Sequence, residues 1–248
     1  MMRLDYMICN NCNYRETCKY VYKDLYFSWE NECYIQHVNE CLKEWNNIHL
    51  EYLGSLSRIL GIRREEVDMV IRMSMLLHDV GKLTKLYQRK IREKVQLEGF
   101  KHEVLGSAYT FKLLNELKLN DEIPYVAGWA VLLHHEALRR NLKPEQLIIP
   151  MNNPEAMVNG RALLLLEDLL KDNLNIGNVN ISDMSRDYVG RIVDWLFKYN
   201  FQSSSKHILR LKVASLQHII CFSDVRAANR IRGGEVSSPY FREVIGVY

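Results

Sequence analysis

The sequence has no apolar run long enough to form a membrane-spanning helix, and its first residues, MMRLDYMICN, do not have the pattern of a secretory signal peptide. We therefore expect a soluble cytoplasmic protein with no membrane partner. Repeats and low-complexity segments are also absent from its 248 residues. Its six cysteines are too few to provide a disulfide scaffold for a chain of this length.

The sequence also has little excess of charge of one sign. A net charge of +3 permits a polyanionic partner but does not require one. Hydrophobic residues make up 48% of the chain and charged residues 25%, which are proportions typical of a globular protein with a sizeable core. The length fits one large domain or two small ones.

No segment alternates apolar and polar residues convincingly enough to predict a strand, although 173–182 contains a weak hairpin pattern. Most of the sequence instead repeats apolar residues at three- and four-residue steps, as helices that pack on a core do. The expected helices cover 33–60, 65–80, 103–119, 124–138, 158–171, 186–199 and 206–232. We predict an all-α fold in which a helical domain, 33–248, follows a cysteine-bearing extension, 1–32.

A histidine and an aspartate, His78 and Asp79, end the second expected helix just before Gly81, a natural helix terminator. His78 shares a face with Val67 and Ile71, so it points into the core. Burying an unpaired carboxylate costs several kcal/mol, and the end of a helix adds partial negative charge. A metal ion would balance these charges, and a buried histidine hydrogen-bonded to the aspartate is the alternative.

Other side chains of the metal-ligating type occur in similar apolar settings: His37, His102, the adjacent pair His134 and His135, and Asp224. Asp224 falls on the apolar stripe of the last expected helix. The neighbouring small residues Ala227 and Ala228 leave room for a ligand, although an aspartate at the edge of a stripe can also reach water. Periodicity places three further histidines away from these positions, and we interpret them as structural or surface residues: His49, His207 and His218.

The order of these residues resembles that of the HD superfamily of metal-dependent phosphohydrolases, and HDVGK matches the central motif of that superfamily. The resemblance spans about residues 33–232. The lone histidine before the His-His pair, together with SDVRAANR, is similar to the CRISPR-associated HD nucleases, the DNA-degrading component of type I interference. Many of these are fused to a helicase, but this sequence contains no phosphate-loop motif and therefore resembles the stand-alone nuclease.

The resemblance implies an HD-domain helical bundle that holds two divalent metal ions. His37, His78, Asp79 and Asp224 would bind the first ion, and Asp79 would bridge to a second ion completed by His102, His134 and His135. Lys82 matches the family lysine beside the metals, so Asp79 and Lys82 are the expected catalytic residues. The alternative for Lys82 is a solvated cation at a helix end. Imidazole-rich ligand sets favour manganese, iron, cobalt or nickel, with magnesium as an alternative.

A two-metal site of this kind activates water for attack on a phosphodiester. The resemblance implies single-stranded DNA as the substrate, with a separate CRISPR-associated helicase and a crRNA-bearing surveillance complex as partners. Basic residues near the ligands are expected to contact the DNA backbone or to form an ordinary solvated face: Arg139, Arg140, Arg226 and Arg230. The sequence leaves endonuclease or exonuclease action open.

Two other functions compete with a nuclease. An HD phosphohydrolase acting on nucleotides or cyclic dinucleotides would use the same metals. A non-enzymatic binding module with a degenerate site is the third possibility, and the complete ligand set argues against it.

The N-terminal cysteines lie outside the family resemblance. Cys9 and Cys12 form a C-x2-C pair, followed by Cys18 and Cys33. This spacing permits a zinc site or an iron–sulfur cluster with four thiolates. Disulfides and inert thiols are the alternatives.

Overall fold

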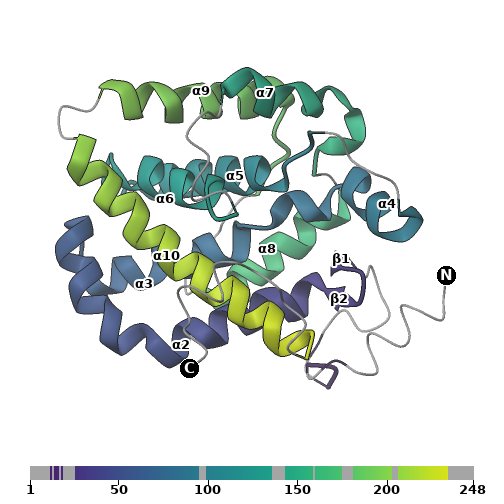
Figure 1. Cartoon of the computed structure of the whole chain (residues 1–248), viewed down its shortest axis with the longest axis horizontal. Helices are drawn as coiled ribbons and strands as arrows, with labels where there is room; N and C mark the ends of the chain where they lie inside the picture. The colour runs from purple at the N-terminus through teal and green to yellow at the C-terminus, as the bar shows by residue number, and fades with distance from the viewer. Residues whose placement is uncertain are drawn as a thin grey trace.

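The computed structural model describes residues 12, 14–16, 18, 26–94, 99–135, 143–158, 160–174, 181–202 and 206–233. These residues are mainly helical, which confirms the predicted all-α class (Figure 1). The helices are α2 (Tyr34–Leu60), α3 (Arg64–Leu77), α4 (Lys85–Glu93), α5 (His102–Leu117), α6 (Ile123–Leu132), α7 (Pro144–Ile148), α8 (Arg161–Asn173), α9 (Arg186–Gln202) and α10 (Lys206–Ile231). Short 3₁₀ turns are η1 (Val80–Leu83), η2 (Ile149–Asn152) and η3 (Pro154–Ala156).

The end of α2 follows its sequence signal, but α3 and α6 end before the positions expected from the sequence. Gly61 ends α2 in the left-handed conformation with φ 73°, and its N–H donates to the Ser57 carbonyl. The expected helix 65–80 ends earlier, at Leu77, so Asp79 lies beyond the helix rather than in its last turn. The expected helix 124–138 also ends early, at Leu132, and residues 133–135 form a turn.

Two expectations about non-helical segments need correction. A short antiparallel hairpin, β1 (Phe27–Trp29) and β2 (Glu32–Cys33), precedes α2 where no strand was expected. Strands this short carry too few residues for an alternating pattern to show in the sequence. The stretch IPMNNPEA, 149–156, has the proline- and asparagine-rich composition that predicts a surface loop, but it forms the 3₁₀ turns η2 and η3 and buries Met151 and Ala156. The weak hairpin pattern at 173–182 lies largely outside the described residues.

The helices enclose a core that contains the largest buried side chains of α2 and α5, including Tyr34, Trp45 and Tyr109. Helix α5 packs along α6, and α10 runs across the bundle against both α2 and α6 (Figure 1). No helix among the described residues is long and apolar enough to span a membrane. The predicted boundary between 1–32 and 33–248 stays a prediction.

One side chain of α4, Gln88, pairs with the backbone of the hairpin. The Gln88 amide accepts a hydrogen bond from the Phe27 N–H and donates to the Phe27 carbonyl, both at 2.9 Å. The same amide nitrogen donates to the carbonyl of Lys82 at 2.6 Å. Gln88 therefore pairs with Phe27 as a neighbouring strand would, and it links the hairpin to η1.

Two glycines allow α5 to lie directly against the segment that carries His78 and Asp79. A Cβ atom on Gly106 would lie 2.2 Å from the His78 carbonyl oxygen, and one on Gly81 would lie 2.4 Å from the His102 carbonyl oxygen. Both distances are far shorter than any tolerated contact with backbone. The glycines therefore set how closely the first turns of α5 approach His78 and Asp79.

The first prediction concerns Gly106. Gly106→Ala should lower the free energy of unfolding by about 1–3 kcal/mol, because the new methyl group collides with backbone that cannot move aside. Gly54→Ala is the matched control, since Gly54 is also inside a helix but its Cβ would meet only the flexible ends of arginine side chains, Arg64 at 3.4 Å and Arg58 at 3.9 Å. That change should be neutral or stabilising. Urea unfolding of both variants measures the difference, and equal stabilities would contradict the packing argument.

Candidate metal centre

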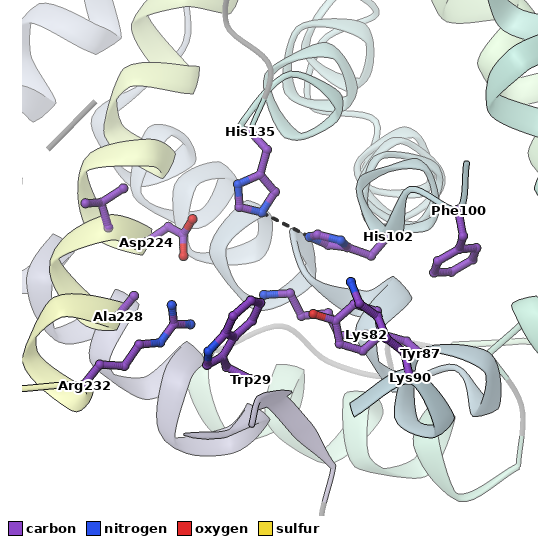
Figure 2. Close-up of a pocket in the computed structure, with 11 residues that line it drawn as sticks. Trp29, Lys82, Tyr87, Lys90, Phe100, His102, His135, Asp224, Ala228 and Arg232 are labelled. Carbon is purple, nitrogen blue, oxygen red and sulfur yellow. Dashed lines mark hydrogen bonds between the residues drawn. The ribbon is translucent and has the colours of Figure 1, made fainter. Parts of the chain in front are cut away.

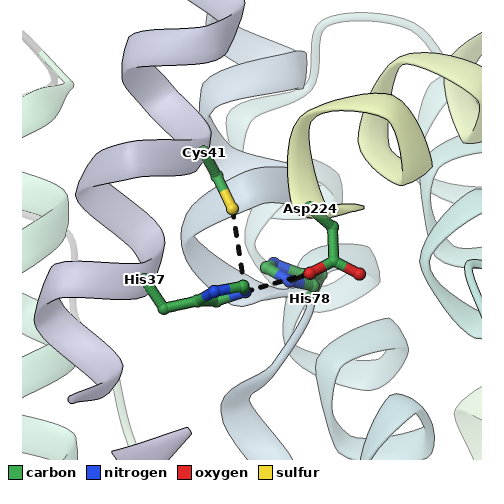
Figure 3. Close-up of side chains that lie close together, drawn as sticks. All are labelled: His37, Cys41, His78 and Asp224. Carbon is green, nitrogen blue, oxygen red and sulfur yellow. Dashed lines mark hydrogen bonds and ion pairs between the residues drawn. The ribbon is translucent and has the colours of Figure 1, made fainter. Parts of the chain in front are cut away.

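The structure brings all seven predicted metal ligands together from separate segments. They form two groups, and within each group the ligand atoms lie within 4.8 Å of one another. The first group contains His37 and Cys41 of α2, His78 at the end of α3, and Asp224 of α10 (Figure 3). The second contains Asp79, His102, His134 and His135.

The carboxylate of Asp79 lies between the two groups. Its Oδ2 atom is 3.4 Å from Nε2 of His37 and 3.4 Å from Nε2 of His78, both in the first group. Its Oδ1 atom is 3.0 Å from Nε2 of His102 and 3.8 Å from Nε2 of His134, both in the second. One carboxylate therefore faces both groups with a different oxygen, which is the geometry a bridging ligand requires.

The buried histidines are oriented by their second ring nitrogen. Nδ1 of His78 lies 2.7 Å from the Met75 carbonyl, and Nδ1 of His134 lies 2.6 Å from the Val131 carbonyl. Because a carbonyl can only accept, each Nδ1 carries the proton and each Nε2 presents a lone pair. This is the usual arrangement of metal-ligating imidazoles, whose other nitrogen donates to a backbone or carboxylate oxygen.

Two imidazole nitrogens at the centre of these groups are buried without a hydrogen-bond partner in the described part of the chain: Nε2 of His78 and Nε2 of His134. Buried polar atoms normally have partners, so a cluster of lone pairs of this kind needs a cation. The side chains therefore fit divalent metal ions.

The charges in the site are consistent with this interpretation. Burial alone would raise the pKa of Asp79, but His78 and Lys82 outweigh it and hold the pKa well below its usual range. Burial would likewise raise the pKa of Asp224, but the neighbouring imidazoles of His37 and His78 lower it well below its usual range. Two ionised carboxylates thus lie in the interior, and positive charge from Lys82 and the imidazoles balances them where no metal ion is bound.

Lys82 is buried, so it is not a solvated cation at a helix end. Its Nζ lies 2.6 Å from Oδ2 of Asp79 and 3.3 Å from Oγ of Ser28. Burial would lower the pKa of Lys82, but the Asp79 carboxylate outweighs it and raises the pKa. The side chain is therefore a fixed positive charge at the edge of the metal groups.

Two residues of the site were not expected from the sequence. Cys41 places its Sγ 3.7 Å from Nε2 of His37, so a thiol joins the first group. Its spacing of one helical turn from His37 was the available signal. Glu32 is also buried, and its Oε1 lies 2.5 Å from Nδ1 of His37 while its Oε2 binds Arg232 at 2.6 Å. Glu32 holds His37 with Nε2 facing Asp79 and Asp224.

The predicted nucleic-acid-binding arginines have contacts within the protein. Arg230 binds the buried carboxylates of Glu40, at 2.9 Å, and Glu44, while Arg226 lies 3.2 Å from Glu44. Arg139 and Arg140 lie outside the described residues. Contact between these arginines and DNA stays a prediction.

The predicted cysteine site is only partly described. Cys9 lies outside the described residues, and Cys12 and Cys18 are half-buried. Cys33 is buried in β2, and burial raises the pKa of its thiol to about 12. Among the described residues these three thiols do not form a group compact enough to bind an ion. The four-cysteine site therefore stays a prediction.

A cleft of about 250 Å³ opens onto the metal groups (Figure 2). His102, His135 and Asp224 border it, and Lys82 reaches it from η1. Its other walls are aromatic and basic, and they comprise Trp29, Tyr87, Phe100, Lys90 and Arg232. The predicted ligands and lysine thus lie where a substrate phosphate can approach them.

The chain is similar to proteins named as nucleases over most of its length. No protein-family model matches it. It is 28% identical over 232 residues to the CRISPR-associated endonuclease Cas3-HD of Methanocaldococcus jannaschii, which covers 89% of this chain and 94% of the relative. It is 24% identical over 226 residues to the protein of the same name from Pyrococcus furiosus, covering 86% and 93%. The solved structure of the Cas3 HD domain protein of M. jannaschii matches with a TM-score of 0.64 and 28% identity, covering 78% of this chain and 97% of that one.

The second prediction concerns Glu32. Glu32→Gln should weaken manganese binding about 10- to 100-fold, because His37 loses the carboxylate that fixes its orientation. Asp68→Asn is the control, since Asp68 also binds an arginine, Arg72 of its own helix at 2.8 Å, but touches no histidine ligand in the described structure. Chelator competition measures the affinities. Equal metal affinity in the two variants would show that Glu32 does not position His37.

Proposed function

Because the chain is a homologue of the CRISPR-associated Cas3-HD endonucleases over most of its length, we propose that it is a metal-dependent nuclease that hydrolyses single-stranded DNA in CRISPR interference. The observation that carries this proposal is the position of Asp79, whose two carboxylate oxygens face separate groups of histidines. A site with two adjacent cation positions is suited to phosphodiester hydrolysis.

Each group of side chains has a distinct part in the proposed site. His37, His78 and Asp224 would hold the first ion, and His102, His134 and His135 would hold the second, with Asp79 shared between them. When bound, divalent transition metals such as manganese supply an activated water and neutralise the phosphate. Glu32 and the backbone carbonyls that receive the Nδ1 protons keep the rings oriented, so the ligands need little rearrangement when metal binds.

Lys82 has two functions in this proposal. Its ammonium balances part of the Asp79 charge, and it lines the cleft through which the phosphate must enter. A buried cation there stabilises the negative charge that develops on the phosphate oxygens in the transition state. Asp79 and Lys82 are therefore the proposed catalytic residues.

The shape of the cleft supports a single strand as the substrate. A cleft of about 250 Å³ enclosed by helices and the hairpin admits one flexible backbone more readily than a rigid duplex. The proposal requires a separate CRISPR-associated helicase and a crRNA-bearing surveillance complex to supply the unwound strand in the cytoplasm. The arginines near the ligands would contact the backbone, and the N-terminal cysteines would bind zinc or an iron–sulfur cluster.

The third prediction is cleavage of circular single-stranded DNA with manganese, and its loss when EDTA is added. A circular substrate has no ends, so its cleavage also identifies endonuclease action. Asp79→Asn should reduce cleavage to background, because both groups lose their shared ligand. His218→Ala should cleave normally, since His218 belongs to neither group. Rapid hydrolysis of nucleotides or cyclic dinucleotides with intact DNA would favour an HD phosphohydrolase instead.

The fourth prediction separates the two functions of Lys82. Lys82→Met should retain its metal, because the lysine is not a ligand, while the rate at saturating DNA falls about 10²- to 10³-fold. Elemental analysis after gel filtration measures the metal content, and single-turnover cleavage measures the rate. If the variant lost its metal but kept the wild-type rate per bound ion, Lys82 would help to retain the metal and would not take part in catalysis.

A further inference from the structure

An exposed tryptophan stands at the mouth of the active-site cleft. Trp29, the last residue of β1, is 44% exposed and lines the cleft together with Lys82 and the histidines of the second group. Figure 2 shows its indole ring directed toward the space in front of His102, His135 and Asp224. A large apolar ring that stays in contact with water does not contribute the stabilisation that its burial would give, which suggests a role outside the folding core.

The local backbone turns Trp29 away from the core. Residues two apart in a regular strand point to the same face, so Phe27 and Trp29 would both be buried or both be exposed. The pairing of β1 with β2 is instead irregular between these two residues. As a result Phe27 is only 1% exposed in the core, while Trp29 faces the cleft.

The ring is also held in place and is close to the reaction centre. The guanidinium of Arg232 lies 5.0 Å from the centre of the Trp29 ring, and Arg232 is itself fixed by its ion pair with the buried Glu32. The residue before Trp29, Ser28, accepts a hydrogen bond from Lys82, which contacts Asp79. Trp29 is therefore an aromatic surface with a fixed position. Its neighbour Ser28 is linked through Lys82 to Asp79, the ligand shared by the two metal groups.

We propose that Trp29 is a nucleobase-stacking subsite, on which a base of the single strand next to the cleaved phosphate lies flat, with Arg232 beside it for the adjoining phosphate. This inference rests on the proposed function. Stacking suits a nuclease without sequence preference, because every base has an aromatic face. It also selects single strands, since the bases of a duplex are already stacked on one another and paired.

The test compares Trp29→Ala and Trp29→Phe with the wild type on a fluorescently labelled single-stranded oligonucleotide. Binding is followed by anisotropy with EDTA present, so that it is measured whether or not cleavage occurs. Trp29→Ala should bind about 5- to 150-fold more weakly, the range expected for one stacked base, and Trp29→Phe should retain most of the affinity. Trp195→Ala is the matched control, because Trp195 is 40% exposed but lies on α9 and does not line the cleft.

A second oligonucleotide, with abasic positions around the cleaved bond, distinguishes stacking from a structural role of Trp29. The wild type should bind the abasic strand as weakly as Trp29→Ala binds the normal strand. Trp29→Ala should bind the abasic strand with nearly the same affinity as it binds the normal strand. Equal losses on both strands, or an unchanged affinity in Trp29→Ala, would overturn the subsite. The abasic comparison in the wild type decides the question even if Trp29→Ala does not fold.

The outcome for the subsite is separable from that for the proposed function. A wild type that binds the strand through its bases but does not cleave it with manganese would contradict the nuclease proposal and leave the stacking result standing. A wild type that cleaves the strand but binds normal and abasic strands equally would contradict the subsite alone.

Discussion

The buried carboxylate of Asp79 imposes the main constraint on this structure. An ionised group in the protein interior is tolerated when cations and hydrogen-bonding groups surround it. Here Lys82 lies 2.6 Å away, and imidazoles approach each of its oxygens. For the imidazole of His102 to lie this close to Asp79, α5 must lie against the end of α3. Gly81 and Gly106 make this possible because they have no side chain. The packing of the helices and the charge of the site thus depend on each other.

A second set of buried charges holds the last helix in place. Glu32 and two buried glutamates of α2, Glu40 and Glu44, bind arginines at the C-terminal end of α10. Breaking such pairs leaves an uncompensated charge in the interior, so the pairs fix how α10 lies on α2. Asp224 is carried by this part of α10, and it lies 3.1 Å from Nε2 of His37 as a result. The arginines therefore contribute to the metal centre even though they do not touch it.

The sequence predicts the elements whose apolar residues recur with a regular period, and it misses the elements too short to have one. Long helices and seven ligands could be identified because periodicity places side chains on a face and the HD pattern orders them along the chain. Cys41 lies one helical turn after His37, but this spacing does not reveal what its thiol faces. The hairpin that carries Trp29 and Glu32 has strands of three and two residues, too short to show a period. The partners of Arg226 and Arg230 are set by how α10 packs on α2, which spacing within one helix does not reveal.

The attachment of the hairpin through Gln88 has a consequence for how this protein can change. The hairpin is joined to the rest of the molecule by the Gln88 amide, by hydrogen bonds of Ser28 with Lys82 and Tyr87, and by the ion pairs of Glu32, not by a shared sheet. Its exposed side chain, Trp29, can therefore change without moving a helix that carries a metal ligand, whereas Ser28 and Glu32 are tied to Lys82 and His37. The mouth of the cleft can thus diverge between related proteins while the two groups of metal-ligating side chains stay the same.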